Sequence, residues 1–339
     1  MLSGKKILIT GGTGTLGRAL TKKLLKDNID TIRIFSRDEG KQLEMATTID
    51  DNRLRFIIGD VRDKERLSYA MEGIDILFHI AALKQVPVAE YNPFEAIKTN
   101  VLGSQNVLDA SIHHNVDLAM AISSDKAVSP LNTYGATKLL MERMFTAANF
   151  YKGKRKTIFT SVRYGNVLGS RGSVVPQFLK TITSSSKIHI TDPKMTRFNI
   201  TLTEALELIY RGLTKAIGGE VFVPKLKAYR LDELAQSLIE TVGKEVEINY
   251  SSIRTGEKLH ESMINEHEAP YTIESEGMYI ILSPELYDKN WSKYMMGKKN
   301  CLQGNYSSDR VDLLTKDEIK MLINKEIFDD TNPYRPLYN

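Results

Sequence analysis

The chain has 339 residues, enough for one large or two modest domains, and 42% of them are hydrophobic, which supports a folded core and excludes global disorder. The net charge of +4 is small for this length and gives no argument for nucleic-acid binding, and the single cysteine, Cys301, excludes a disulfide framework and is typical of a reducing cytoplasm. No stretch approaches the roughly 20 apolar residues of a membrane span and residues 1–6 lack the apolar core of a signal peptide, so we expect a cytoplasmic protein with no membrane contact.

A glycine-rich turn follows the first predicted strand, residues 6–10, and precedes a helix predicted to begin near Arg18. Both Gly-x-Gly-x-x-Gly and Gly-x-x-Gly-x-x-Gly spacings are present in it. Glycines permit a tight turn and let the backbone approach a pyrophosphate, while the helix N-terminus offers free N–H groups. The turn therefore predicts a dinucleotide site in which the contacts come from Gly11, Thr13, Gly14, Thr15, Leu16 and Gly17.

The second predicted strand, residues 31–35, ends at a group of residues that suits a phosphate. Ser36 and Arg37 follow the strand, and Lys41 lies shortly after them. A hydroxyl, a guanidinium and an amine are suited to a 2′-phosphate, so these residues favour NADP over NAD. The two acidic residues after Arg37 leave a plain solvated turn open as an alternative.

The next two strands, residues 54–58 and 75–79, end in residues that are expected to line the same site. An acidic residue follows the first of them and can accept a hydrogen bond from an adenine amine. Small residues follow the second and allow close approach of a cofactor. His79 lies inside an apolar strand and is predicted to be a core residue. The predicted cofactor contacts here are Asp60, Val61, Ala81 and Ala82.

The fifth strand, residues 118–122, leads into the stretch that carries the chemistry. Ser124, Asp125 and Lys126 follow it directly, at the carboxyl end where open α/β sheets bind their ligands. Tyr134 and Lys138 are four residues apart on the helix that follows, so they lie on one face of it. The ammonium of Lys138 is expected to lower the pKa of the Tyr134 phenol and to make it an acid/base for a substrate hydroxyl.

Each part of this stretch also has a plain structural interpretation. Tyr-x-x-x-Lys occurs often by chance, and Ser-Asp-Lys at a strand end is usually a solvated turn. The preceding dinucleotide site makes the functional interpretation the stronger one. Strand and helix alternate five times up to this point, which predicts an α/β fold with a Rossmann-type, doubly wound parallel sheet.

The C-terminal half is predicted to hold a smaller substrate part that is interleaved with the sheet. A strand at residues 157–162 is followed by helices at 203–216 and 231–242 and by a strand at 219–224. We assign residues 1–167 mainly to the dinucleotide-binding domain and 168–267 mainly to the substrate part. Residues 268–339 are predicted to be an irregular extension packed on the core, with a short helix near 316–324.

Arginines in turn-rich loops of this half are candidates for binding a diphosphate or a sugar. The alternative is that they are solvated surface residues, because sequence alone does not show that they converge. The arginines concerned are Arg171, Arg197 and Arg254.

The chain resembles the extended short-chain dehydrogenase/reductases in its glycine turn, in Asp60-Val61 and in Tyr134-x-x-x-Lys138. Within them it is similar to the inverting UDP-N-acetylglucosamine 4,6-dehydratases of pseudaminic acid synthesis, from residue 5 to about residue 265 and more loosely beyond. The motifs are Phe35-Ser36-Arg37-Asp38-Glu39, Gly59-Asp60-Val61-Arg62-Asp63, Ala81-Ala82-Leu83-Lys84, Ser124-Asp125-Lys126-Ala127, Arg163-Tyr164-Gly165-Asn166-Val167, Ser170-Arg171-Gly172-Ser173-Val174, Thr191-Asp192, Met195-Thr196-Arg197-Phe198 and Gly256-Glu257-Lys258-Leu259-His260-Glu261.

The resemblance implies a dehydratase mechanism with no net redox change. Tyr134, helped by Lys138 and Ser124, would take the C4 hydroxyl proton while hydride passes to NADP. Lys126 would remove the C5 proton, and a protonated Asp125 would assist departure of the C6 hydroxyl. Related enzymes that retain the C5 configuration carry Glu after the Asp, so the lysine favours inversion.

The resemblance also implies a UDP-N-acetylglucosamine substrate, no metal and a homo-oligomer. The implied substrate contacts are Lys84, Asn166, Arg171, Thr191, Arg197, Arg254 and Glu257. Three alternatives stay open: a UDP-sugar 4-epimerase, a C5-retaining dehydratase of the same fold, and a non-catalytic NADP-binding protein. The sequence leaves open the downstream glycan, which is pseudaminic acid or another surface glycan.

Overall fold

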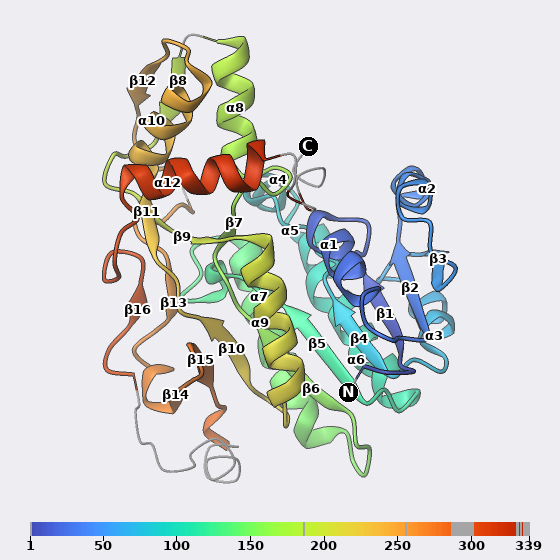
Figure 1. Cartoon of the computed structure of the whole chain (residues 1–339). Helices are drawn as coiled ribbons and strands as arrows, with labels where there is room; N and C mark the ends of the chain where they lie inside the picture. Colours follow the sequence, from blue (N-terminus) through green and yellow to red (C-terminus); the bar gives the residue numbers. More distant parts are fainter. Residues whose placement is uncertain are drawn as a thin grey trace.

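The computed structural model describes residues 2–185, 187–254, 256–285, 302–329, 332 and 334. Within these residues, the largest sheet has nine strands in the order β14-β15-β10-β6-β5-β4-β1-β2-β3 (Figure 1). The strands from β3 to β10 run parallel, and β15 and β14 add an antiparallel edge. Their bounds are β1 Lys6–Thr10, β2 Thr31–Ser36, β3 Leu54–Ile58, β4 Ile76–His79, β5 Leu118–Ile122, β6 Ile158–Val162, β10 Val221–Pro224, β14 Thr272–Ser275 and β15 Met278–Ile281.

Helices cover both faces of this sheet because its strands are apolar on both sides. In β1, Ile7 and Ile9 pack into one cluster with α1 and α9, whereas Leu8 packs into another with α3, α6 and α7. This confirms the predicted Rossmann-type, doubly wound sheet, and its strand order reverses between β1 and β4, where such folds bind ligands. The helix bounds are α1 Thr15–Leu24, α3 Lys64–Met71, α6 Gly103–His113, α7 Thr133–Tyr151 and α9 Leu202–Lys215, and α2 Glu39–Thr48 lies near the β2–β3 edge.

The connection between β4 and β5 shapes the loop beside the ligand crevice. It contains α4 (Val86–Tyr91), α5 (Pro93–Ala96) and a π-helical segment, η1 (Ile97–Leu102), before α6. Within η1 the buried side chain of Asn100 bonds both the N–H and the carbonyl of Leu83 and the hydroxyl of Thr137. These bonds fix the loop after β4 against α7.

A smaller unit stands at the carboxyl end of the sheet, at the top of Figure 1. Its core joins α8 (Val174–Ser184), α10 (Leu231–Val242) and α12 (Lys316–Ile323) with the pair β8 (Lys187–Ile190) and β12 (Glu247–Tyr250). A second sheet, made of β7 (Asn166–Val167), β9 (Thr196–Ile200) and β11 (Ala228–Arg230), lies between this unit and the main sheet. The predicted helices at 203–216, 231–242 and 316–324 correspond to α9, α10 and α12.

The C-terminal extension is more regular than the sequence suggested. β14 and β15 continue the main sheet, and β13 (Ser262–Ile264) pairs with β16 (Tyr306–Ser307). The prediction of an irregular tail was therefore wrong for these residues, because backbone pairing with the sheet orders them. Cys301 and residues 286–300 lie outside the described residues. The domain limits at residues 167 and 267 stay a prediction.

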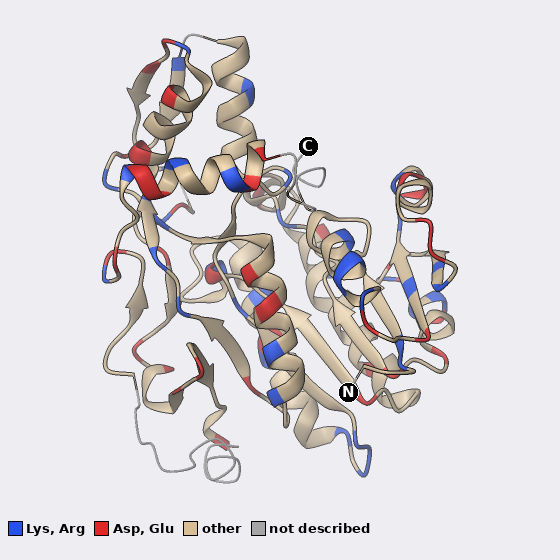
Figure 2. Cartoon of the chain, in the orientation of Figure 1, with Lys and Arg blue, Asp and Glu red and all other residues tan. Residues whose placement is uncertain are grey.

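Charged residues are mixed over the surface rather than segregated by sign. Figure 2 shows lysines and arginines next to acidic residues on the outer helices, such as α9 and α12, while the central strands β4, β5 and β6 carry neither. Among the helices of the described chain, none is both long and apolar enough to cross a bilayer.

Candidate active site

The glycine-rich turn joins β1 to α1 at the carboxyl edge of the sheet. α1 begins at Thr15, with Gly14 as its N-cap, rather than near Arg18 as the sequence suggested. Gly11 has a φ of 67°, and a Cβ atom there would lie 2.8 Å from the backbone of Ala81. The turn therefore needs glycine to pass the loop after β4, and it leaves the N-terminus of α1 open.

Two adjoining pockets extend from this turn. The first runs between the turn and the loops after β4, β5 and β6, and its lining includes Gly11, Gly14, Thr15, Leu16, Ala81, Ala82, Lys84, Ser124, Lys126, Tyr134, Lys138 and Asn166. The second shares Gly11 and Lys41 with it and is also lined by Thr13, Ser36, Arg37, Asp60 and Val61. The structure thus brings together the residues that the sequence assigned to a dinucleotide, apart from Gly17. Gly17 packs against Gly12, where a Cβ atom would lie 2.5 Å away.

The second pocket has charged residues of both signs at its rim over a buried polar floor. Ser36 is buried at the tip of β2 and receives a hydrogen bond from Gln42, which had no role in the sequence interpretation. Arg37 is half exposed, and its guanidinium lies 3.5 Å from Asp60. Lys41 pairs with Asp38. All of these charged groups are close enough to solvent to exchange partners when an anionic ligand arrives.

Tyr134 stands where the first pocket reaches the end of β5. Its phenol is buried and hydrogen-bonds to Ser124. Lys138, one turn along α7, donates instead to the carbonyl of Ile122 at 2.7 Å. The side chain of Asn132 caps this helix by accepting a hydrogen bond from Gly135 N–H. The cap fixes the first turn of the helix, in which Tyr134 lies.

The expected lowering of the Tyr134 pKa by Lys138 was wrong for the protein as it stands. Burial raises the pKa of Tyr134 to about 12 and outweighs the opposing effects of the Lys126 charge and the Ser124 hydrogen bond. Burial also lowers the pKa of Lys138 to about 8, so this amine loses its proton more readily than an exposed lysine does. Side-chain spacing along a helix revealed the pair but not the low-dielectric surroundings that decide its titration.

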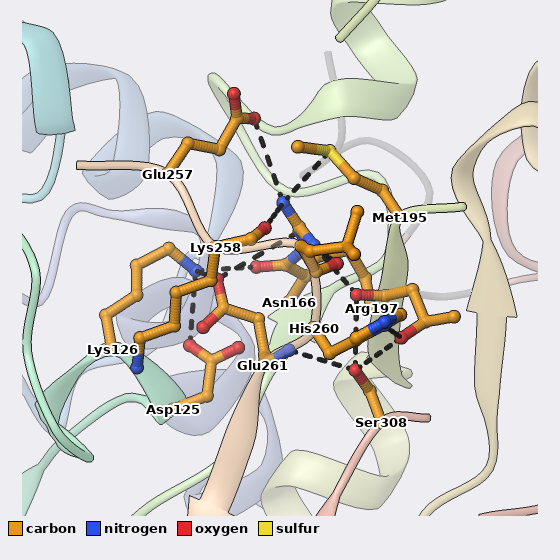
Figure 3. A network of polar contacts seen from close by, with 12 residues as sticks. Asp125, Lys126, Asn166, Met195, Arg197, Glu257, Lys258, His260, Glu261 and Ser308 are labelled. Atoms are coloured by element: carbon orange, nitrogen blue, oxygen red, sulfur yellow. Dashed lines mark hydrogen bonds and ion pairs between the residues drawn. The ribbon is translucent and has the colours of Figure 1, made fainter. Parts of the chain in front are cut away.

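Lys126 lies at the centre of a polar network (Figure 3). Its Nζ is 3.2 Å from Oδ1 of Asp125, 3.4 Å from Oδ1 of Asn166 and 3.5 Å from Oε1 of Glu261. Asp125 is almost fully buried and also accepts a 2.8 Å hydrogen bond from Ser124. Its Oδ2 is buried without a hydrogen-bond partner among the described residues. The network therefore joins the predicted general base to the predicted general acid.

Arg197 comes from β9 and braces the far side of this network. Its guanidinium donates to the carbonyls of Lys258 and Leu259 and lies 3.7 Å from the Glu257 carboxylate. The side chain is buried. These bonds hold segment 257–261 against β9, so Arg197 has a structural role in addition to any contact with substrate.

Only some of the predicted substrate residues lie together in the lining of one pocket. Lys84 and Asn166 line the first pocket, and Lys84 Nζ donates to the carbonyl of Arg171 at the pocket mouth. Arg171 and Arg254 have exposed side chains. The residues outside the pocket lining are Arg171, Thr191, Arg197, Arg254 and Glu257.

Several residues of the site had no assigned role in the sequence analysis. Gln85, Tyr164 and Ser173 line the first pocket, and Glu261 lies against Lys126. Tyr164 and Glu261 lie within motifs that the sequence shares with known enzymes, and these motifs could have indicated that the two residues belong to the site. Gln85 lies in a loop with no such signal.

The arrangement fits a nicotinamide dinucleotide in its polar chemistry. The close approach at Gly11 forms a cradle for a pyrophosphate, the second pocket offers hydroxyl, cationic and carboxylate groups, and the first pocket ends at a buried phenol with a hydroxyl partner. A phenol, an amine and a carboxylate beside that end can move protons on a bound hydroxyl compound. The described residues hold no cluster of three or more His, Cys, Asp or Glu side chains fit for a metal ion.

A Rossmann fold with Tyr134 and Lys138 in its pocket defines a protein of the short-chain dehydrogenase/reductase class. Residues 7–283 match the model of the polysaccharide biosynthesis protein family. The chain belongs to that family.

Two similar relatives carry the names of different activities. The chain is 48% identical over 288 residues to a UDP-N-acetylglucosamine 4,6-dehydratase (inverting) of Campylobacter jejuni, which covers 84% of this chain and 85% of the relative. It is 40% identical over 329 residues to a UDP-glucose 4-epimerase of Rickettsia felis, covering 95% and 96%. The X-ray structure of Pen from Bacillus thuringiensis is 40% identical, has a TM-score of 0.89 and covers 95% of this chain and 98% of its own.

Proposed function

We propose that the protein is a UDP-N-acetylglucosamine 4,6-dehydratase that inverts C5 and gives UDP-2-acetamido-2,6-dideoxy-β-L-arabino-hex-4-ulose. The observation that carries the proposal is the convergence of Tyr134, Ser124, Lys126 and Asp125 at one end of a dinucleotide-shaped pocket. The 48% identity to a Campylobacter dehydratase of this type supports it.

The cofactor of this proposal is NADP, held by the glycine turn, Asp60 and the groups at the tip of β2. Bound in the first pocket, it would accept hydride from C4 of the sugar and return it at C6. Ser36, Arg37 and Lys41 line the pocket where a 2′-phosphate would lie, which favours NADP over NAD. Lys138 would bind the ribose of the cofactor near Tyr134.

The residues of the chain then move three protons. Tyr134 takes the proton of the C4 hydroxyl, with Ser124 as its hydrogen-bond partner. The ketone formed at C4 acidifies the C5–H bond, and neutral Lys126 removes that proton. Asp125 in its protonated form donates to the departing C6 hydroxyl, which leaves as water. Since Asp125 lies 3.2 Å from Lys126, a proton can pass between them for the next turnover.

Inversion requires that C5 be reprotonated from the face opposite to Lys126 or after the sugar has turned. We assign inversion at C5 because Lys126 follows the buried Asp125. Dehydratases that retain the C5 configuration carry a glutamate at the position of this lysine. Lys84 and Asn166 line the first pocket and are proposed to contact the sugar. Arg171, Thr191, Arg197, Arg254 and Glu257 are proposed for the UDP moiety.

Incubation with UDP-N-acetylglucosamine and catalytic NADP tests the proposal. The expected product has lost one water molecule, as seen by mass spectrometry, and NMR shows a 6-deoxy-4-keto sugar with the L-configuration at C5. Retained C5 configuration would leave a dehydratase but reject inversion. A product of unchanged mass would reject elimination.

A 4-epimerase is the second candidate, because the Rickettsia relative at 40% identity carries that name. It would use the same Tyr134 chemistry to make the C4 ketone but would leave C5–H and C6–OH intact. Conversion of UDP-N-acetylglucosamine or UDP-glucose to its C4 epimer without loss of water would favour it. No turnover of either substrate would favour a binding protein.

We further propose a cytoplasmic homo-oligomer that supplies pseudaminic acid or another surface glycan. The family to which the chain belongs is one of polysaccharide biosynthesis, which supports a part in making a surface glycan. Size-exclusion chromatography with light scattering tests the oligomer. Deletion of the gene followed by analysis of surface glycans tests the pathway.

A further inference from the structure

A carboxylate from the C-terminal part of the chain lies against the predicted base. Oε1 of Glu261 is 3.5 Å from Nζ of Lys126 and 4.0 Å from Nε of Arg197 (Figure 3). The Glu261 residue is 3% exposed, and its Oε2 is buried with no hydrogen-bond partner in the part of the chain that the structure describes. A buried, half-satisfied carboxylate is costly unless a nearby charge offsets it.

The extension after β15 holds Glu261 in this position. Glu261 N–H donates to Oγ of Ser308 at 3.0 Å, and Ser308 N–H donates to the carbonyl of Glu261 at 2.8 Å. Ser308 Oγ also lies 2.7 Å from the Thr196 hydroxyl, which in turn contacts Nδ1 of His260 at 2.8 Å. Segment 260–261 is thus bonded to elements far away in sequence, which hold the backbone that carries the Glu261 carboxylate beside Lys126.

Two carboxylates therefore face one amine. Oδ1 of Asp125 lies 3.2 Å from Nζ of Lys126, and Oε1 of Glu261 lies 3.5 Å from it. Burial disfavours the ammonium, but these two carboxylates outweigh burial and raise the pKa of Lys126 above its usual value. A general base must be neutral to accept a proton, so the same charges that hold the amine also limit the pH at which it can act.

We propose that Glu261 is a positioning residue for Lys126: it holds the amine at the sugar end of the pocket and sets the pH at which the amine can accept the C5 proton. The second half of this inference, proton removal from C5, rests on the proposed function. The first half, the charge contact, stands without it.

Other charged and titratable groups surround Lys126 and act on it as well. Asp125 acts from its own loop and favours the ammonium. Arg197 from β9 opposes it, and Lys258 from the segment before β13 carries a like charge. The hydroxyls of Tyr134 on α7 and Tyr229 on β11 also interact electrostatically with the amine. Of these groups, Glu261 is the one that a single isosteric change can make neutral without altering a proposed reacting group.

The rate at which Lys126 is acetylated rises with its neutral fraction, because only the unprotonated amine attacks the anhydride. The purified, substrate-free protein is treated with limiting acetic anhydride at a fixed pH near 8, and the modified peptide is measured by mass spectrometry. Loss of an opposite charge within about 4–6 Å lowers an amine pKa by about 1–3 pH units. Lys126 in Glu261→Gln should therefore be acetylated about tenfold faster or more than in the unaltered protein.

Glu268→Gln is the matched control, because Glu268 is also a buried carboxylate in an ion pair, but with Arg163, away from Lys126. It should leave Lys126 acetylation unchanged. Glu261→Asp keeps the charge and should leave the rate nearer to that of the unaltered protein. An unchanged rate in a folded Glu261→Gln, or an equal rise in Glu268→Gln, would overturn the proposal.

Should Glu261→Gln fail to fold, Ser308→Ala tests the contact between Glu261 and Lys126 indirectly, by changing a residue that supports Glu261. It removes the hydrogen bonds of the Ser308 hydroxyl with Glu261 N–H and with Thr196 without changing any charged group, and by loosening segment 260–261 it should raise Lys126 acetylation. An unchanged rate in a folded Ser308→Ala would then reject the positioning.

Exchange of the C5 proton of the sugar nucleotide in D2O connects the contact to catalysis. In Glu261→Gln the pH at which exchange rises should be about 1–3 units lower than in the unaltered enzyme. An unmoved midpoint would reject the proposed control of pH. If the unaltered protein shows neither exchange nor a 6-deoxy product at any pH, the dehydratase proposal fails, whereas the acetylation rates still decide whether Glu261 controls the charge of Lys126.

Discussion

The Nζ of Lys126 lies 3.2 Å from Oδ1 of Asp125, the residue directly before it in the chain. Asp125 is almost fully buried, while the Lys126 side chain is 22% exposed and lines the pocket. A short 3₁₀ turn, η2 (Asp125–Ala127), creates this contact, because it folds back after the extended Ser124. Consecutive residues on a strand would point to opposite faces, so the turn is what lets acid and amine share one site.

Lys126→Ala should separate sugar oxidation from elimination. Taking hydride from C4 needs Tyr134 as a base, whereas loss of the C6 hydroxyl also needs the C5 proton removed. We expect cofactor and UDP binding to persist while the rate of 6-deoxy product formation falls about 100-fold to 10,000-fold. Product formation, C5 deuterium exchange and a melting curve on the same variant measure this.

The competing view is that Lys126 only ties down its loop through Asp125 and Glu261. Lys126→Ala would then lower the melting temperature but keep near-normal exchange and product at low temperature. Lys64→Ala, which removes an exposed lysine paired with Asp109, is the control for loss of a surface ion pair. It should leave both rate and stability nearly unchanged.

Tyr134→Phe should block the first step itself. Phenylalanine fills the same buried position but has no hydroxyl to take the C4 proton. In a single turnover with saturating substrate, we expect no absorbance from reduced cofactor, in contrast to Lys126→Ala, where some can accumulate. Normal reduction of the cofactor by Tyr134→Phe would remove Tyr134 from its proposed role.

Arg37→Ala should reduce the preference for NADP over NAD. Arg37 is half exposed at the rim of the second pocket and is free to turn from Asp60 to a phosphate. A charge-assisted hydrogen bond contributes roughly 1.5–3 kcal/mol, so the ratio of the two dissociation constants should change by about tenfold or more. Titration calorimetry with both cofactors measures it, with Arg155→Ala as the exposed-arginine control. An unchanged ratio would reject the 2′-phosphate assignment.

Arg197→Ala should weaken UDP binding by about tenfold or more, on the same energetic grounds. The structure adds a second expectation: the carbonyls of Lys258 and Leu259 lose their donor, so the melting temperature should also fall. Arg211→Ala, on the exposed side of α9, is the control. If stability falls while the UDP dissociation constant stays the same, Arg197 braces segment 257–261 and is not a UDP ligand.

His79 should make the protein less stable in mild acid. Burial lowers the pKa of His79 to about 3, whereas in the unfolded chain it is about 6.5. The depressed pKa means that neutral His79 stabilises the fold above pH 6.5, and this contribution is lost as the pH falls towards 3. Between pH 7 and pH 5 the unaltered protein should lose about 2 kcal/mol more than His79→Gln.

Urea unfolding at the two pH values gives that difference directly. His79 bonds the hydroxyls of Thr10 and Ser104 in the core, so His79→Gln is expected to be less stable at both pH values. The comparison therefore concerns the change with pH and not the absolute stability. Equal acid sensitivity in the two proteins would show that His79 does not titrate on unfolding in this range.

Local features of the sequence were sufficient for the parallel strands of the main sheet and for the residues at the proposed dinucleotide end of the site. The apolar run at 118–122 became a strand because a strand buried on both faces must be continuously apolar, and the shorter apolar stretches within 6–10 and 31–35 became strands of the same sheet. The glycine turn and Tyr134-x-x-x-Lys138 could be recognised because their chemistry depends on spacings of a few residues. The residues predicted to bind a cofactor line the two adjoining pockets, apart from Gly17, and their contacts with a cofactor stay a prediction.

Only the tertiary structure decided what surrounds each charge. Glu261 reaches Lys126 from a distant part of the sequence, and Ser308 fixes it there. Burial, which depends on the packing of the whole chain, reversed the expected shift of the Tyr134 pKa. Sequence spacing therefore determined which groups are present at the site, whereas long-range packing determined which of them carry a proton, because electrostatic energy depends on distance and on exclusion of water.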